Sequence, residues 1–294
     1  MRRPRTILRC LFCAAALLLC AAALSLPARA DADTLCYIAA PEAASDSTVR
    51  LQRADGADWL FLPASAELSS LTFRFPGGPG TLSGNWRQIP VVSGEPFDLR
   101  ALYPYAPADG RYALSLETAA GALDFTLMRS EHVAAMFLSS PDETHDRAWV
   151  EQDKDHKAKG GTLLMLNADG SAVYDGTLKQ LKGRGNSTWR LPKRPYQIKL
   201  SQATDLMETG LAEEVNGTWV LLADYAAPSH LHNRYTFDLA AALGLEFTPH
   251  SRPVDLWYDG EYRGTYLLSE KTEVGAGRVD VPDLGDPPAD WEVL

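Results

Sequence analysis

The residues best suited to chemistry lie in one glycine-containing segment, Lys182–Trp189, and in the run Pro192–Leu200 that follows it. Gly183 and Gly185 are two positions apart, so the backbone between them can curl and turn successive amide N–H groups toward one point. Such a nest of amides prefers an anion, often a phosphate. Short side-chain donors follow directly, at Asn186, Ser187 and Thr188.

This segment is basic within an acidic chain. Without the five arginines of the first thirty residues, the formal charge of −10 becomes −15. A strand over 195–200 would place Gln197 and Lys199 on one face, and a strand lysine behind a glycine-rich turn is one way to hold nucleotide phosphates. The same pattern also fits a structural alternative, in which a tight turn precedes an edge strand whose basic residues prevent aggregation. The segment has neither the Walker spacing nor the G-x-G-x-x-G spacing of known phosphate-binding loops. Both interpretations stay open for the basic residues Lys182, Arg184, Arg190, Lys193, Arg194 and Lys199.

The elements around this segment are mostly strands with one helix. Strands are expected at 134–138, 161–166 and 171–174. A helix is predicted from Ser229, a suitable N-cap, to Leu243, with Gly244 just past its end. Asp259-Gly260 predicts a tight type I′ hairpin between strands 254–258 and 261–268, which places Trp257 opposite Tyr262.

The first thirty residues have the pattern of a secretory signal peptide. Basic residues precede the uncharged run Cys10–Leu24, and a cleavage site is predicted after Ala30. Residues 31–294 contain no second apolar run near ~20 residues, so no transmembrane segment is expected after signal removal. We expect a secreted or cell-surface protein, and its acidity argues against binding nucleic acid.

Residues 31–130 differ from the rest in pattern. Short segments with period-two alternation, such as 71–75, 112–116 and 123–127, are separated by turn clusters. This pattern predicts an antiparallel, Ig-like β-sandwich module over 31–130. With the strands and the single helix of 131–294, the predicted fold class is α+β.

Several motifs in series resemble the CotH family of spore-coat protein H-like atypical protein kinases. They begin with Gly183–Trp189 and Pro192–Leu200 and continue in the family's order, and together they cover roughly residues 134–280. The further motifs are Trp219–Tyr225, Asn233-Arg234, Phe237–Ala240, Leu243–Leu245, Val254–Leu256, Tyr258–Gly264 and Tyr266–Lys271.

The resemblance implies an atypical kinase-like domain, of which 131–294 would be the N-terminal portion: a β-rich lobe with one main helix. It implies binding of ATP with Mg²⁺ or Mn²⁺ and phosphorylation of surface or coat proteins. The turn formed by Gly183, Arg184, Gly185, Asn186 and Ser187 would lie over the phosphates, with Lys193 and Lys199 as basic contacts. Segment 267–271, which includes Glu270, would reach the adenine, and Asp238 on the helix would pair with Lys199.

The sequence departs from the family pattern in its acidic residues. Phosphoryl transfer uses carboxylates to hold the metal and orient the acceptor, and the resemblance places these residues beyond Leu294. Asp280, Asp283, Asp286 and Asp290 lie among prolines in a segment typical of a linker. Whether this chain is itself an enzyme stays open, and we expect it to be a fragment.

The sequence is therefore compatible with two functions. The first is a secreted kinase of the CotH type that transfers the γ-phosphate of ATP to Ser or Thr of surface or coat proteins. The alternative is an exported, non-catalytic surface or cell-wall binding or assembly protein on a kinase-like scaffold. No metal site of the protein's own is predicted, because His230 and His232 would point about 200° apart on a helix.

Overall fold

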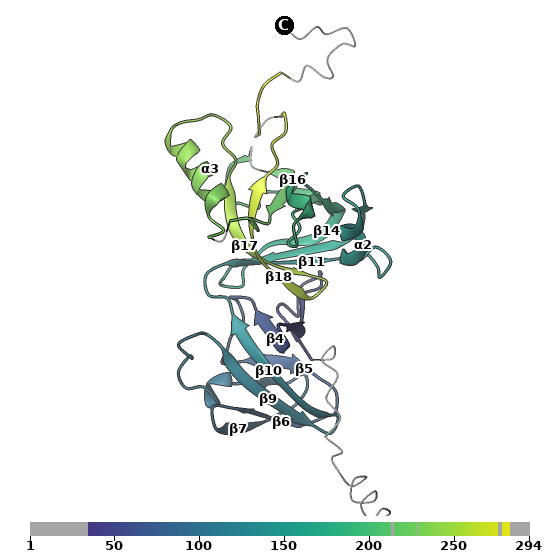
Figure 1. Ribbon diagram of the computed structural model, residues 1–294, viewed down its shortest axis with the longest axis vertical. Coiled ribbons are helices and arrows are strands. Elements are labelled where there is room, and N and C mark those ends of the chain that lie inside the picture. Colours follow the sequence, from purple (N-terminus) through teal and green to yellow (C-terminus); the bar gives the residue numbers. More distant parts are fainter. Residues whose placement is uncertain (1–34, 213–214, 228, 276–277, 283–294) are drawn as a thin grey trace, which may run out of the picture.

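The computed structural model describes residues 35–212, 215–227, 229–275 and 278–282. The predicted signal peptide and the acidic residues from Asp283 onward lie outside these ranges. Figure 1 shows two parts stacked one on the other, with β4 to β10 in the lower part and β11 to β18 in the upper part. None of the described helices is long and apolar enough to cross a bilayer.

The first part consists of two sheets that share one apolar core. One sheet has the order β2-β1-β5-β8 and the other β3-β4-β10-β9-β6-β7. Rings from both sheets meet in the core, for example Phe73 and Phe125 with centroids 6.2 Å apart. The strands are β1 (Cys36–Ile38), β2 (Thr48–Arg50), β3 (Gln52–Ala54), β4 (Ala57–Leu62), β5 (Leu71–Arg74), β6 (Gly80–Gly84), β7 (Arg87–Val91), β8 (Pro96–Phe97), β9 (Tyr112–Thr118) and β10 (Gly121–Arg129), with the 3-10 turn η2 (Leu99–Ala101) before β9.

The second part is a closed β-barrel. Among the described residues, seven strands pair in the ring β14-β13-β11-β17-β18-β16-β15, and β15 pairs back onto β14. Apolar side chains such as Met136, Ile198 and Trp219 fill the interior. The strands are β11 (Ala134–Ser139), β13 (Thr162–Leu166), β14 (Ala172–Gly183), β15 (Tyr196–Thr204), β16 (Asn216–Leu222), β17 (Ser251–Tyr258) and β18 (Glu261–Glu270), with the short β12 (Lys157–Ala158) beside β14.

The predicted fold class, an α+β chain in which an Ig-like β-sandwich precedes a kinase-like lobe with one main helix, is wrong. The chain is mostly β, and its second part is the barrel. The prediction failed because β14 runs for twelve residues and pairs on both sides, with β13 and with β15, so the sheet curls until its edges meet. Among the described residues, each of the seven strands of the ring therefore has a neighbour on both sides.

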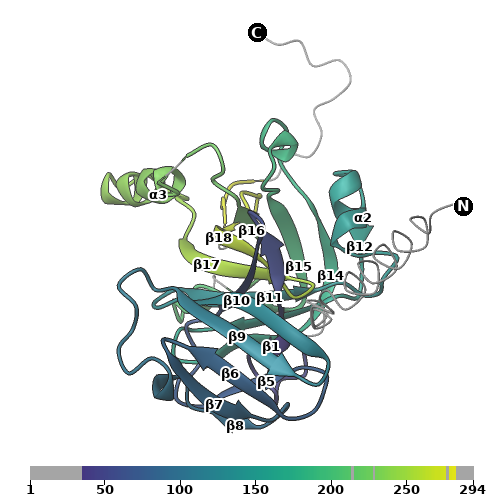
Figure 2. The ribbon, with the colours of Figure 1, turned by 60° about the horizontal axis from the view of Figure 1, so that its bottom comes forward.

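The helices lie outside the barrel. Figures 1 and 2 both show α2 (Arg147–Gln152) and α3 (His232–Ala242) on opposite sides of it. The predicted helix is present, and Gly244 adopts the expected positive φ of +70° just after it. No residue of α3 is buried, however. The apolar side chains Tyr235 and Leu239 on the helix, and Leu231 and Leu243 directly before and after it, are exposed. The helical spacing therefore did not mark a core face.

The β17–β18 hairpin joins the two parts. Asp259 and Gly260 both have positive φ, and Trp257 pairs with Tyr262 as predicted. The Trp257 ring is 1% exposed and stacks on Phe137 at 5.1 Å, and its Nε1 donates to the Phe61 carbonyl of β4 at 3.1 Å. The Trp257 indole is therefore carried by a barrel strand but packs in the apolar core of the first part.

We predict that Trp257→Ala lowers the free energy of unfolding by about 3–5 kcal/mol, because it removes a large buried ring and leaves a cavity. Trp86→Ala is the matched control: Trp86 is fully exposed, and its replacement should change stability by no more than about 0.5 kcal/mol. Urea unfolding of the three chains measures both effects. Equal stability of the two variants would contradict the packing described for Trp257.

Candidate functional site

The predicted glycine-containing turn connects β14 to β15. Gly183 ends β14, and the Trp189 ring of η3 (Thr188–Arg190) lies directly over it, where a Cβ would come within 2.2 Å of Cζ3. The Arg184 amide donates to the Pro195 carbonyl at 3.1 Å and closes the base of the connection. Gly185 has φ +83°, a left-handed conformation that favours glycine. The two glycines are therefore required by the shape of the loop.

A cavity of about 450 Å³ opens beside this connection. It lies between the β14–β15 connection, the segment after β16 and the first turn of α3. Its polar lining residues are Arg184, Thr188, Lys193, Asp224, His232 and Asn233. Gly185 also lines the cavity, so the structure brings three of the predicted phosphate-contacting residues, Arg184, Gly185 and Lys193, to one hollow.

Lys193 is the most constrained cation of the cavity. Its Nζ donates to the Thr265 carbonyl of β18 and lies 4.4 Å from the centre of the Tyr266 ring. Burial lowers the pKa of Lys193 to about 8, although Asp224 and Asp255 oppose that shift. The side chain is thus held in place before any ligand binds, and its ammonium is poorly solvated.

Arg184 and Asp224 complete the charge distribution. Burial lowers the pKa of Arg184 and raises the pKa of Asp224. Asp224 has a positive φ of 46°, and its Oδ1 accepts a hydrogen bond from the Asn233 amide of α3. Its Oδ2 is buried and has no hydrogen-bond partner among the described residues. Two half-buried cations and one half-buried carboxylate therefore leave the cavity with a net positive charge.

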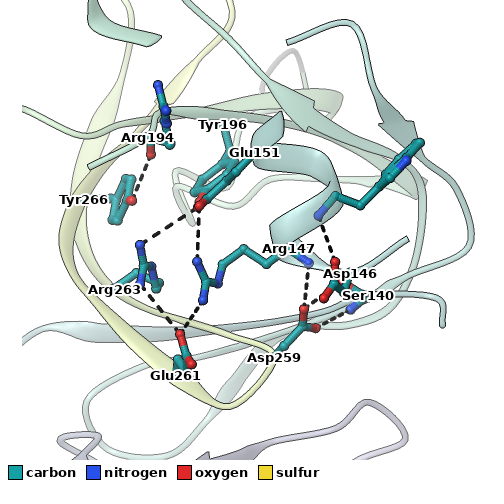
Figure 3. Close-up of polar contacts among 11 residues, drawn as sticks. Ser140, Asp146, Arg147, Glu151, Arg194, Tyr196, Asp259, Glu261, Arg263 and Tyr266 are labelled. Atoms are coloured by element: carbon teal, nitrogen blue, oxygen red, sulfur yellow. Dashed lines mark hydrogen bonds and ion pairs between the residues drawn. The ribbon is translucent and has the colours of Figure 1, made fainter. Parts of the chain in front are cut away.

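A polar cluster connects α2 with β15 and with the β17–β18 hairpin (Figure 3). Glu151 of α2 accepts hydrogen bonds from the Tyr196 hydroxyl and from Arg147, the latter at 3.2 Å, and lies 3.9 Å from Arg263. Arg147 also reaches Glu261 at 2.5 Å. The Tyr266 hydroxyl donates to the Arg194 carbonyl at 2.9 Å. The aromatic ring that contacts the Lys193 ammonium is therefore also hydrogen-bonded to the next residue of the loop.

Other predicted residues lie outside the cavity. Asn186 and Ser187 are exposed, and the Asn186 Oδ1 accepts from Lys154 at 3.3 Å. Lys199 is exposed on the outer face of β15, between the buried Ile198 and Leu200. Glu270 is buried at the end of β18, in an ion pair with Arg278. None of the four lines the cavity.

The predicted pairing of Lys199 with Asp238 does not form. Asp238 is exposed and bonds Arg234, one turn away on α3, at 2.9 Å. In the part of the chain that the structure describes, no ion pair joins Asp238 to Lys199. Both side chains are exposed, Lys199 on the outer face of β15 and Asp238 on α3, where Arg234 is its partner.

Sequence reasoning missed Asp224 and Asn233 as site residues. Both stand in segments that carried the family resemblance, Trp219–Tyr225 and Asn233-Arg234, but neither was given a role. Their contact depends on the loop between β16 and α3, which no periodicity describes. Among the described residues, no group of three or more His, Cys, Asp or Glu side chains is suited to hold a metal.

Comparison with known proteins supports the resemblance over part of the chain. Residues 181–283 match the family model described as CotH kinase protein, and this segment contains the whole cavity. No curated protein matches the sequence. A solved structure from Bacteroides thetaiotaomicron, assigned to the glycoside hydrolases, aligns with 13% identity and a TM-score of 0.21. The alignment covers 79% of this chain and 54% of that one, so the chain spans about half its length.

We predict that Gly183→Ala lowers stability by about 1–3 kcal/mol, because the added methyl group would overlap the Trp189 ring. Gly217→Ala is the matched control, since a Cβ at Gly217, also in a barrel strand, meets no atom within 4 Å. Thermal unfolding measures both. A Gly183→Ala chain as stable as the Gly217→Ala chain would contradict the position of Trp189.

We also predict that one lysine titrates near pH 8. The pKa of Lys193 falls from 10.5 to about 8 on folding, so between these values the unfolded chain binds more protons than the folded chain. Stability relative to Lys193→Met should therefore rise with pH between about 8 and 10.5. NMR of ¹³Cε-labelled lysine identifies the signal, which should vanish in Lys193→Met. A spectrum without a lysine titrating below pH 9 would refute the burial of Nζ.

Proposed function

We propose that the cavity between the β14–β15 connection and α3 binds the phosphates of ATP. In this proposal the chain is the nucleotide-binding part of a secreted CotH-type kinase that transfers the γ-phosphate to Ser or Thr of surface or coat proteins. The match of residues 181–283 to the CotH kinase family supports the kind of reaction. The electrostatics of the cavity support the ligand.

The observation that carries the proposal is the pair of half-buried cations at one cavity. Neither Arg184 nor Lys193 makes an ion pair with another described residue, and burial lowers the pKa of both. Burying an unpaired charge is unfavourable, so an anion that enters the cavity relieves a penalty already present in the folded chain. Arginine suits phosphate through its paired donors, and lysine through its compact charge.

Asp224 fits the divalent cation that accompanies ATP. Mg²⁺ is usually held by one or two carboxylates together with phosphate oxygens and water. The buried Oδ2 of Asp224 lacks a partner among the described residues, while Asn233 fixes its Oδ1. Asp224 would therefore hold Mg²⁺ or Mn²⁺, which when bound neutralises phosphate charge. Arg184 and Lys193, which line the same cavity, would bind and orient the phosphates.

A second candidate function, non-catalytic binding or assembly at the cell surface, is favoured by the exposed face of α3. Leu231, Tyr235, Leu239 and Leu243 follow one another at about helical spacing and are all exposed. A contiguous apolar face of this kind usually marks a protein contact. The two functions differ in one respect that can be measured, which is whether ATP binds.

We predict that ATP with Mn²⁺ or Mg²⁺ raises the melting temperature of the chain, and that Lys193→Met and Arg184→Gln each weaken ATP binding at least tenfold. A lost hydrogen bond to a charged group is worth about 1.5–3 kcal/mol. Lys199→Met and Arg190→Gln are matched controls with exposed side chains and should bind as the unmodified chain does. Binding should weaken from pH 7 to pH 9, and Lys193→Arg should remove most of that dependence.

Isothermal titration of the folded variants measures these affinities, and labelled ATP measures transfer to Ser or Thr. Loss of binding in Lys199→Met with retention in Lys193→Met would place the phosphates on the outer face of β15 and refute the cavity. An unmodified chain that binds no ATP with either metal would leave the binding and assembly function.

A further inference from the structure

A second hollow lies on the outer face of the six-stranded sheet, away from the barrel cavity. Its volume is about 1180 Å³. Figure 2 shows β10, β9, β6 and β7, four of the strands that form it, side by side. Asp124, Ser115, Ser83 and Gln88 follow one another in register across these strands, and all four line the hollow.

The hollow extends across the strands of the sheet, from β3 to the β6–β7 turn. Small side chains of two inner strands, Ala113 and Ser115 of β9 and Ser83 of β6, line it. Arg53 of β3 and Trp86 in the β6–β7 turn line it from opposite edges of the sheet. A trough with polar groups along its floor and an aromatic ring at one end suits an elongated ligand.

Trp86 contributes nothing to the stability of the isolated fold, for two reasons. Its side chain is 104% exposed, so none of its apolar surface is buried. Asn85 and Trp86 also form a two-residue type I′ turn with φ of 49° and 63°, in which the second position normally carries glycine. Tryptophan, the largest side chain, therefore occupies a turn position at which glycine would give a more stable fold.

A second exposed aromatic residue stands on the loop that this turn contacts. The Asn85 side-chain amide donates to the Leu102 carbonyl at 3.1 Å, and Arg87 donates to the Ala101 carbonyl at 3.1 Å. Tyr105, three residues further on, is 88% exposed. Aromatic side chains of this type supply rigid, amphipathic contact area at low entropic cost.

The charges of the groove favour a neutral ligand. The Arg53 guanidinium is bonded to Asp58 at 3.1 Å and to the Gly56 carbonyl at 2.8 Å, and Arg87 is bonded to the Ala101 carbonyl. These cations already have partners within the protein. The remaining lining offers the Asp124 carboxylate, the Gln88 amide and serine hydroxyls, which exchange hydrogen bonds with hydroxyl groups. The Asp124 carboxylate also repels an anion.

We propose that this groove binds a neutral oligosaccharide several sugar units long. A pyranose ring presents a face of C–H bonds that can lie on the Trp86 indole, and hydroxyl groups around its edge that can bond to Asp124, Gln88 and the serines. This binding is independent of the ATP cavity. It gives the first part of the chain the role of holding the protein at a polysaccharide surface.

The test uses the full chain and a panel of soluble hexasaccharides: β-1,4-linked glucose, xylose, mannose and N-acetylglucosamine, with hexagalacturonate as the acidic probe. Isothermal titration should detect at least one neutral hexasaccharide and a much weaker response to hexagalacturonate. Trp86→Gly should weaken that binding at least tenfold while leaving the melting temperature unchanged or higher, because glycine suits the type I′ position. Asp124→Asn should weaken it less.

Tyr235→Ala, which removes an exposed aromatic ring from α3, is the matched control and should bind as the unmodified chain does. Absence of binding to every neutral hexasaccharide would overturn the proposal. So would binding that persists in Trp86→Gly, preference for hexagalacturonate, or binding of a casein-derived peptide pool at this groove in place of the sugars. ATP binding should be the same in Trp86→Gly, which separates this test from that of the cavity.

Discussion

The pairing of β15 with β14 is the constraint on which the rest of the second part depends. It closes the barrel. Because Gly183 and Tyr196 pair directly, the twelve residues between them must form a loop whose two ends lie side by side. The loop can do so only because Trp189 folds over a glycine and Gly185 adopts a left-handed conformation. Closure therefore decides where the basic residues of the loop lie.

Closure also explains why cations are buried at the barrel end. Lys193 is drawn onto the Tyr266 ring and the Thr265 carbonyl of β18, two strands away around the ring from β15. Carbonyl and ring contacts compensate only part of the desolvation of an ammonium group, so its pKa stays low. The Glu151 cluster, with two arginines and Tyr196, connects α2 to β15 and β18 (Figure 3). The Lys193 side chain is thus held at the cavity by its carbonyl and ring contacts, beside the half-buried Arg184.

Features set by neighbouring residues could be predicted from sequence. The Asp259-Gly260 hairpin, the register of Trp257 with Tyr262 and the glycine after α3 depend on local backbone preferences, and all are as expected. The family resemblance over 181–283 also needed only the order of short motifs. Features that depend on which strand faces inward were not predictable. The alternation of side chains along a strand predicts that Gln197 and Lys199 share a face. Only the closed barrel determines that this face is the outer one.

By itself, the sequence determined that a glycine-containing, basic turn exists and that it lies in a segment that resembles the CotH kinase family, because composition and spacing are local properties. The tertiary structure alone decided that Lys193 rather than Lys199 reaches the cavity and that Asp238 stays with Arg234 on its own helix. It also brought Asp224 and Asn233 to the same hollow. These outcomes follow from barrel closure, which joins residues far apart in the chain and therefore leaves no signal in any short window of sequence.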